Sequence, residues 1–97
     1  MEIKKTQNEE KVVLALEGRL DTTTAPQLEA YVKDLEGVEE LTLDFDKLTY
    51  ISSAGLRVLL AAQKIMEKQG SMKLQNVCAD IMEVFDITGF ADILDIE

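Results

Sequence analysis

Segments with the composition of β-strands alternate along this chain with segments whose apolar residues recur at helical spacing. The strand-like segments are residues 3–6, 11–20, 41–45 and 72–74, and the helix-like segments are residues 25–36, 54–69 and 80–88. Residues 93–96 suit either a last strand or a short helix. Because strands joined by helices need right-handed crossovers, the pattern predicts an α/β fold with a mixed, mostly parallel sheet flanked by helices. The predicted order is β-β-α-β-α-β-α plus a short terminal element, in one domain over residues 1–97.

Local signals predict where these elements bend and end. Gly18, near the end of the second strand, indicates a bulge or a close approach of another backbone segment. Thr24 and Gln27 have the spacing of a capping box, in which the threonine hydroxyl accepts from the amide of Gln27. Gly37 is expected to end the first helix. Residues 46–52 are predicted to connect the third strand to the long helix.

The chain is strongly acidic, with 19 carboxylates against 10 basic residues and a net charge of −9. Binding to the phosphate backbone of a nucleic acid needs clustered lysine and arginine, so we expect no nucleic-acid partner. The charge fits partners that are proteins, and solubility alone explains it equally well. No apolar run is long enough to span a bilayer, so we expect no membrane partner.

The residue types on which most enzymes rely are scarce. There is no histidine, which removes the commonest general base and most zinc sites. We therefore expect no enzyme activity, no cofactor and no metal. The single cysteine, Cys78, cannot form an internal disulfide, which favours a reducing, cytoplasmic location. We expect Cys78 to be a small buried apolar residue.

Two serines, Ser52 and Ser53, lie where the long helix is expected to begin. A serine at such a place can simply cap the helix, because its oxygen accepts one of the free amides of the first turn. A helix N-terminus is also a favourable place for an anion, so a phosphate on Ser53 would be tolerated there. Gly55 disfavours the helix, and its missing side chain is expected to leave the backbone near Ser53 open to an approaching group.

The long helix has an apolar face and a charged face. The apolar arc is predicted to pack on the sheet and contains Val58, Leu59, Ala62, Ile65 and Met66. The opposite, solvated face carries Arg57, Lys64 and Lys68. Leu56 and Leu60 flank the apolar arc, and the sequence leaves open whether they widen the core or form an apolar patch beside the serines.

Three stretches of the chain together carry a family resemblance. They are Gly18-Arg19-Leu20-Asp21, Ile51-Ser52-Ser53-Ala54-Gly55-Leu56 and Val84-Phe85-Asp86-Ile87-Thr88-Gly89-Phe90. In this order they resemble the second-strand exit, the signature loop and the C-terminal helix of the STAS-domain anti-sigma factor antagonists. The resemblance spans nearly the whole chain.

The resemblance implies a protein that is switched by phosphorylation. In the family, an anti-sigma factor, often also a serine kinase, binds the unphosphorylated antagonist and so releases its sigma factor. Phosphorylation of the signature serine breaks the complex, and a phosphatase restores it. Aligned on the Gly55-Leu56 pair, the phosphorylated position falls on Ser53, with Ser52 as the alternative. The family usually has Asp before the acceptor and Ser or Thr after it, where this chain has Ser52 and Ala54.

The partner surface implied by the resemblance combines the signature loop with the loop after the second strand. It comprises Asp21, Thr22, Ser52, Ser53, Ala54, Gly55, Leu56, Arg57 and Leu60. Asp21 is equally well explained as an acidic residue that the dipole of the following helix favours. Asp44 and Asp46 are expected near the same end of the sheet, where they would repel a phosphate. We expect the domain to be a monomer.

Three other functions stay open on the sequence. The same fold serves as a constitutive interaction domain that is never phosphorylated, and the departures around Ser53 are compatible with this alternative. A small enzyme with Ser53 as its nucleophile would lack a base to activate the hydroxyl. A fragment of an anion transporter fits poorly with the N-terminal strand pair and with the lack of a membrane segment.

Overall fold

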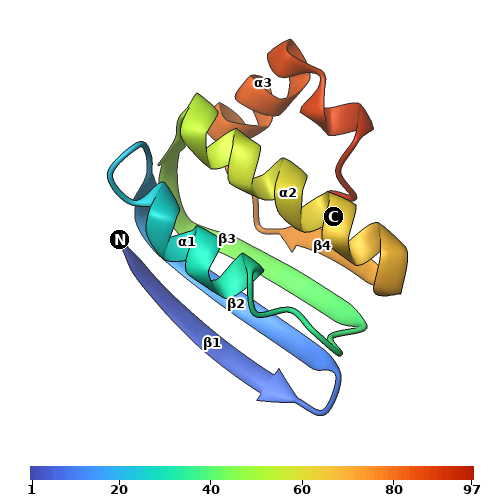
Figure 1. Cartoon of the computed structure of the whole chain (residues 1–97). Coiled ribbons are helices and arrows are strands. Elements are labelled where there is room, and N and C mark those ends of the chain that lie inside the picture. Colours follow the sequence, from blue (N-terminus) through green and yellow to red (C-terminus); the bar gives the residue numbers. More distant parts are fainter.

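The chain folds into four strands and three α-helices. The computed structural model describes residues 1–97. In chain order the elements are β1 (Glu2–Asn8), β2 (Lys11–Leu20), α1 (Ala25–Val32), β3 (Glu40–Ile51), α2 (Ser53–Gln69), β4 (Ser71–Gln75), α3 (Ala79–Thr88) and a short 3₁₀ helix, η1 (Phe90–Asp92). Helices α1 and α2 lie on one face of the sheet (Figure 1). This order confirms the predicted α/β fold.

The strands form one sheet in the order β1-β2-β3-β4. β1 and β2 are an antiparallel hairpin, closed by a turn in which Glu9 has a φ of 58°. β2, β3 and β4 run parallel to one another, so the mixed, mostly parallel sheet is confirmed. The last residues are neither a full strand nor an α-helix. Ile96 forms a single parallel bridge with Leu74.

The core lies between the sheet and the helices. Along β2, Leu14 and Leu16 are buried, whereas Ala15 between them is half-buried on the opposite face. The buried residues of α2 include Val58, Leu59, Ala62 and Met66. These four confirm the predicted apolar arc, and Ile65 lies half-buried at its edge. Burying one leucine side chain stabilises the fold by about 1.5–3 kcal/mol. Because these leucines all lie on one face of the sheet, they determine which face packs against the helices.

β3 is longer than the sequence predicts and continues to Ile51, through the residues expected to form a connection. It pairs with β2 across two register shifts, one between Ala15 and Glu17 and one between Gly18 and Arg19. These irregularities interrupt the alternation of apolar and polar residues along β3. The sequence pattern therefore does not predict the second half of the strand. Gly18 has a φ of 106° and lies at the second shift, so the predicted bulge is confirmed.

α1 is shorter than the sequence predicts. It ends at Val32 with Lys33 as its cap, so Gly37 does not end it. A loop follows in which Leu35 and Val38 are buried. The side chain of Gln69, at the end of α2, donates hydrogen bonds to the carbonyl oxygens of both residues. This distant contact stabilises an irregular segment where helical spacing of apolar residues predicts another turn of helix.

Cys78 is exposed, contrary to the expectation that it is buried. It occupies the position just before α3, and its sulfur lies 4.0 Å from the carbonyl oxygen of Leu48. β4 ends at Gln75, so α3 begins beside the part of β3 that β4 leaves unpaired. α3 therefore starts toward the end of the sheet at which β3 finishes.

Candidate functional site

The ends of β2 and β3 bring the two predicted site loops together. Leu20 and Ile51 are paired across the two strands, and the amide of Ser52 donates to the carbonyl oxygen of Leu20 at 2.9 Å. The loop that begins at Asp21 and the start of α2 at Ser53 therefore leave the sheet from neighbouring points. Parallel strands place their carboxyl ends at one edge, and this pairing explains the juxtaposition.

Asp21 organises the loop that follows β2. Its carboxylate oxygen Oδ1 accepts hydrogen bonds from the Thr23 amide at 3.0 Å, the Thr23 hydroxyl at 2.8 Å and the Thr24 amide at 3.2 Å. The Thr24 hydroxyl accepts from the Asp21 amide at 2.8 Å and donates to the Arg19 carbonyl oxygen at 2.7 Å, with Oδ1 of Asp21 as a second acceptor at 3.2 Å. The predicted capping box of Thr24 and Gln27 is therefore wrong: Thr24 makes no side-chain cap of α1.

These hydrogen bonds act on the charge of Asp21. The bond from the Thr23 hydroxyl is the main cause that lowers the pKa of the Asp21 carboxyl below its usual value. Partial burial opposes this effect, while the amides of Thr24 and Thr23 add to the lowering. Asp21 is therefore held as an anion at the edge of the sheet that carries the signature loop.

Arg19 and Tyr50 belong to the same region, although the sequence analysis does not select them. The guanidinium carbon of Arg19 lies 4.0 Å from the centre of the Tyr50 ring, and its Nε lies 3.8 Å from Oδ2 of Asp21. The strand pattern could have indicated Arg19. Successive side chains of a strand point to opposite faces, so Arg19 must point outward if its apolar neighbour Leu20 points into the core. The cation thus sits between an aromatic ring and the Asp21 carboxylate.

The two serines of the signature loop differ in accessibility. Ser52 occupies the N-cap position of α2, yet its hydroxyl makes no capping hydrogen bond. Its Oγ is buried and has no hydrogen-bond partner. Ser53 is the first residue of α2 and is exposed. Of the two hydroxyl groups, only that of Ser53 is presented to an approaching protein.

Gly55 has a structural role that differs from the expected one. It is buried, and a Cβ at this position would lie 2.7 Å from Cγ of Leu20 and 2.9 Å from Cγ1 of Ile51. Real Cβ atoms do not approach other atoms so closely. The missing side chain therefore lets the first turn of α2 pack onto the ends of β2 and β3, and it opens no path to Ser53.

The rest of the predicted partner surface divides into buried and accessible residues. Leu56 is only 7% exposed and belongs to the core, which settles its role as a widening of the core contact. Leu60 is half-buried at the edge of α2. The exposed members of the predicted set are Thr22, Ser53 and Arg57, and the half-buried ones are Asp21, Ser52, Ala54 and Leu60.

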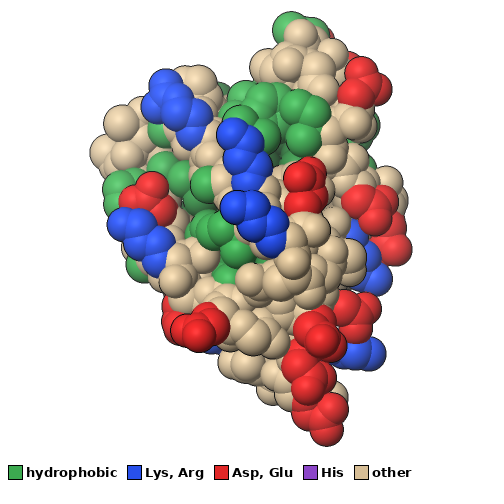
Figure 2. Space-filling model, turned by 45° about the vertical axis from the view of Figure 1, so that its right-hand side comes forward, with side chains coloured by type: hydrophobic (Ala, Val, Ile, Leu, Met, Phe, Trp, Pro, Cys, Tyr) green, Lys and Arg blue, Asp and Glu red, His purple; other side chains and the backbone are tan.

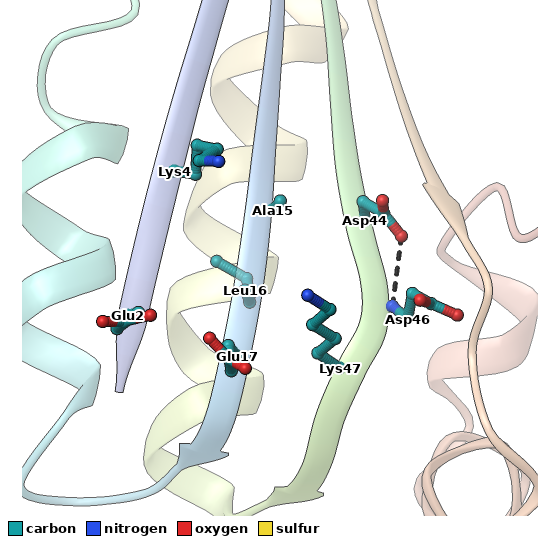
Figure 3. A pocket seen from close by; sticks show the side chains of 8 residues that line it. All are labelled: Glu2, Lys4, Ala15, Leu16, Glu17, Asp44, Asp46 and Lys47. Atoms are coloured by element: carbon teal, nitrogen blue, oxygen red, sulfur yellow. Dashed lines mark hydrogen bonds between the residues drawn. The ribbon is translucent and has the colours of Figure 1, made fainter.

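Asp44 and Asp46 do not lie at the expected place. They line a hollow of about 390 Å³ on the face of the sheet opposite α1 and α2 (Figure 3). Its wall is formed by Glu2, Lys4, Ala15, Leu16, Glu17, Asp44, Asp46 and Lys47. Because β3 continues to Ile51, Asp46 is five residues before its end, or about 16 Å along the strand. The expected repulsion of a phosphate by these two carboxylates is therefore not supported.

Two further features of the structure bear on the class of site. No three His, Cys, Asp or Glu side chains are grouped so that they could hold a metal ion. No helix is both long enough and apolar enough to cross a membrane.

Comparison with known protein families assigns the chain to one of them. The family model described as "Mlab, STAS domain" matches residues 3–95, which is nearly the whole chain. The chain belongs to the STAS family of anti-sigma factor antagonists. The anti-sigma-B factor antagonist of Bacillus subtilis (strain 168) is 37% identical over 92 residues, covering 93% of this STAS domain and 84% of that protein. Members of this family are regulatory, protein-binding domains and not enzymes.

Solved structures show the same STAS fold. The unphosphorylated form of the anti-sigma factor antagonist SpoIIAA matches with a TM-score of 0.78 and 21% identity, over 99% of this chain and 87% of SpoIIAA. The phosphorylated form of SpoIIAA, a Bacillus cell fate determinant, matches with a TM-score of 0.77 and 22% identity, over 99% of this chain and 91% of SpoIIAA.

Proposed function

We propose that this STAS domain binds an anti-sigma factor through the surface around Ser53 and that phosphorylation of Ser53 releases it. Binding by the unphosphorylated domain would free a sigma factor and so regulate sigma-factor-dependent transcription. The anti-sigma factor, acting as a serine kinase, would transfer the γ-phosphoryl group of ATP to the Ser53 hydroxyl, which loses its proton, and leave ADP. A phosphatase would return the domain to its binding state. We place this cycle in the cytoplasm and expect the domain to act as a monomer.

The observation that carries the proposal is the contrast between Ser53 and Ser52. Ser53 is exposed at the first turn of α2, whereas the hydroxyl of Ser52 is buried. A kinase must reach the hydroxyl that it modifies, so the contrast favours Ser53 over the alternative acceptor. The name of the 37% identical Bacillus subtilis relative supports the role of an anti-sigma factor antagonist, and the two forms in which SpoIIAA has been solved support a switch by phosphorylation.

The surroundings of Ser53 allow a phosphate to change binding without unfolding the domain. A phosphoserine adds about −1.5 to −2 charge at neutral pH, and the free amides of a helix start favour it. Arg57 lies four residues further along α2, is exposed and makes no ion pair, so it can face the phosphate. In a partner interface the same charge must be desolvated or paired, which opposes binding.

Affinity capture from extract of the native cell tests this function. Wild type and Ser53→Asp are used as baits, and captured proteins are identified by mass spectrometry. Ser71→Asp is the matched control, because Ser71 is also exposed but lies on β4 opposite Glu40, the first residue of β3. We expect wild type and Ser71→Asp to retain an ATP-binding anti-sigma factor and Ser53→Asp to lose it.

A constitutive interaction domain is the second candidate function. The observation in its favour is Ser52, which replaces the usual Asp of the family and points its hydroxyl into the protein. A kinase that reads a carboxylate at this position would find none. If Ser53→Asp and wild type retain the same partner equally well, the domain is an unswitched binding module.

A further inference from the structure

The outer face of α3 carries an exposed isoleucine on the same arc as two carboxylates. α3 buries Ile81 and Phe85. At 100° per residue, Asp80, Glu83 and Ile87 share an arc on the opposite side of the helix. All three are exposed, and Ile87 is exposed to 77%. We call these three residues the α3 outer face.

Nothing else in the chain covers Ile87. It is the most exposed of the three large apolar side chains that reach the surface, the others being Ile93 at 45% and Tyr50 at 40%. Figure 2 brings the right-hand side of Figure 1 forward and shows hydrophobic side chains at the surface, with basic as well as acidic side chains beside them. A single exposed apolar side chain is common on protein surfaces, so Ile87 is of interest only together with the two carboxylates on its arc, which offer a partner apolar contact and charge in one place.

The segment of the chain that carries this face holds charged residues of one sign only. After Lys73 the chain has no lysine or arginine, and its carboxylates are Asp80, Glu83, Asp86, Asp92, Asp95 and Glu97. These six account for −6 of the net charge of −9. Only Glu97 is in an ion pair, with Lys73 at 3.7 Å, so the carboxylates of the α3 outer face are unpaired. A negative surface of this kind attracts a positive partner.

α3 lies toward the same end of the sheet as the signature loop. Its start contacts β3 at Leu48, three residues before Ile51, which ends the strand and precedes Ser52 and Ser53. Figure 1 shows α3 near the part of the molecule where α2 begins. One partner can therefore reach both the signature loop and α3.

We propose that the α3 outer face is a second docking surface for the anti-sigma factor, and that it receives a basic segment of that protein. In this contact, lysine or arginine side chains of the partner face Asp80 and Glu83, and an apolar side chain covers Ile87. The inference rests on the proposed function and names the chemistry of its partner. The two contacts have different roles: Ser53 controls release, whereas the α3 outer face speeds association and adds apolar burial.

Calorimetric titration of the captured, purified anti-sigma factor tests the inference. The domains compared are wild type, Asp80→Lys/Glu83→Lys, Ile87→Ser and the control Glu36→Lys. Glu36 is also exposed, but it lies in the loop that Gln69 contacts, at the far end of α2 from Ser53. We expect the double variant and Ile87→Ser each to weaken binding roughly tenfold, and Glu36→Lys to change it little. Thermal unfolding is measured in parallel, because exposed substitutions should leave the fold intact.

Salt supplies the second readout. Between about 50 and about 300 mM NaCl, the affinity of wild type should fall more steeply than that of the double variant, since screening weakens only the charge contacts that remain. If wild type and both α3 variants bind alike while Ser53→Asp does not bind, the α3 contact is refuted and the switch stands. If no anti-sigma factor binds wild type, the proposed function fails and this inference fails with it.

Discussion

Leu20 fills the space that a side chain on Gly55 would occupy, because a Cβ at position 55 would lie 2.7 Å from Cγ of Leu20. Leu20 is fully buried at the end of β2, and Gly55 lies in the first turn of α2. This contact sets how closely the start of α2, with Ser53, approaches the end of the sheet.

Gly55→Ala should therefore destabilise the domain. Overpacking a core costs about 1–3 kcal/mol, and the gain in helix propensity of about 1 kcal/mol offsets only part of it. Urea denaturation measures the change in the free energy of unfolding. The matched test is the same substitution in a Leu20→Ala background, where the clash with Leu20 is absent, the one with Ile51 remains, and Gly55→Ala should cost less. Equal costs in the two backgrounds would show that Leu20 is not the obstacle.

Asp21 should make the stability depend on pH in the acid range. Because its pKa is lowered in the folded state, it binds a proton more readily when the chain is unfolded. Its contribution is therefore complete above the unfolded pKa of about 4 and is lost as the pH falls through the folded pKa. Urea denaturation of wild type and Asp21→Asn from about pH 7 to about pH 3 should show the advantage of wild type shrinking below about pH 4. A constant difference over this range would contradict the account.

Ser52→Ala should be neutral or stabilising, although replacing an N-cap serine by alanine usually costs about 1 kcal/mol. The reason is that the Ser52 hydroxyl makes no capping bond and is buried without a partner. Removing an unpaired buried hydroxyl relieves a penalty of about 1–3 kcal/mol. A loss of about 1 kcal/mol in thermal or urea unfolding would show that this hydroxyl caps α2 in solution.

Arg57 should lower the second pKa of a phosphate on Ser53. Residues four apart on a helix face one another, and pairing with the guanidinium favours the doubly charged phosphate. Phosphoserine is introduced at position 53 by an expanded genetic code, so that no kinase is needed, and its titration is followed by ³¹P NMR. The phosphate pKa should be higher in Arg57→Gln than in the wild-type background. Lys64→Gln, further along the same helix, is the control and should leave it unchanged.

The sequence predicts those parts of the fold that local patterns determine. The second strand, from Lys11 to Leu20, is found with its correct limits because its apolar residues are dense. The long helix ends at Gly70 as expected. The end of β3 is missed because pairing with β2, across two register shifts, holds its polar residues in a strand. Such pairing cannot be seen in one segment alone.

In the candidate site, too, local sequence predicts some features, whereas others depend on contacts between distant segments. That the two serines lie where the long helix begins follows from local sequence, and the structure starts α2 at Ser53, one residue before the predicted Ala54. The contact between Gly55 and Leu20 joins residues far apart in the chain, so its cause is invisible until the strand ends meet. The burial of Ser52 Oγ depends on the same packing. The helical repeat of α3 predicts that Ile87 is exposed. Only the structure shows that no other part of the chain covers it.

The central claim is that a phosphate on Ser53 abolishes binding while the fold persists. It is tested most directly by titrating the purified anti-sigma factor with the unmodified domain and with the domain that carries phosphoserine at position 53. The account predicts binding of the unmodified domain, at least a roughly hundredfold loss of affinity on phosphorylation, and unfolding temperatures that agree within a few degrees. Equal affinities of the two forms would contradict it.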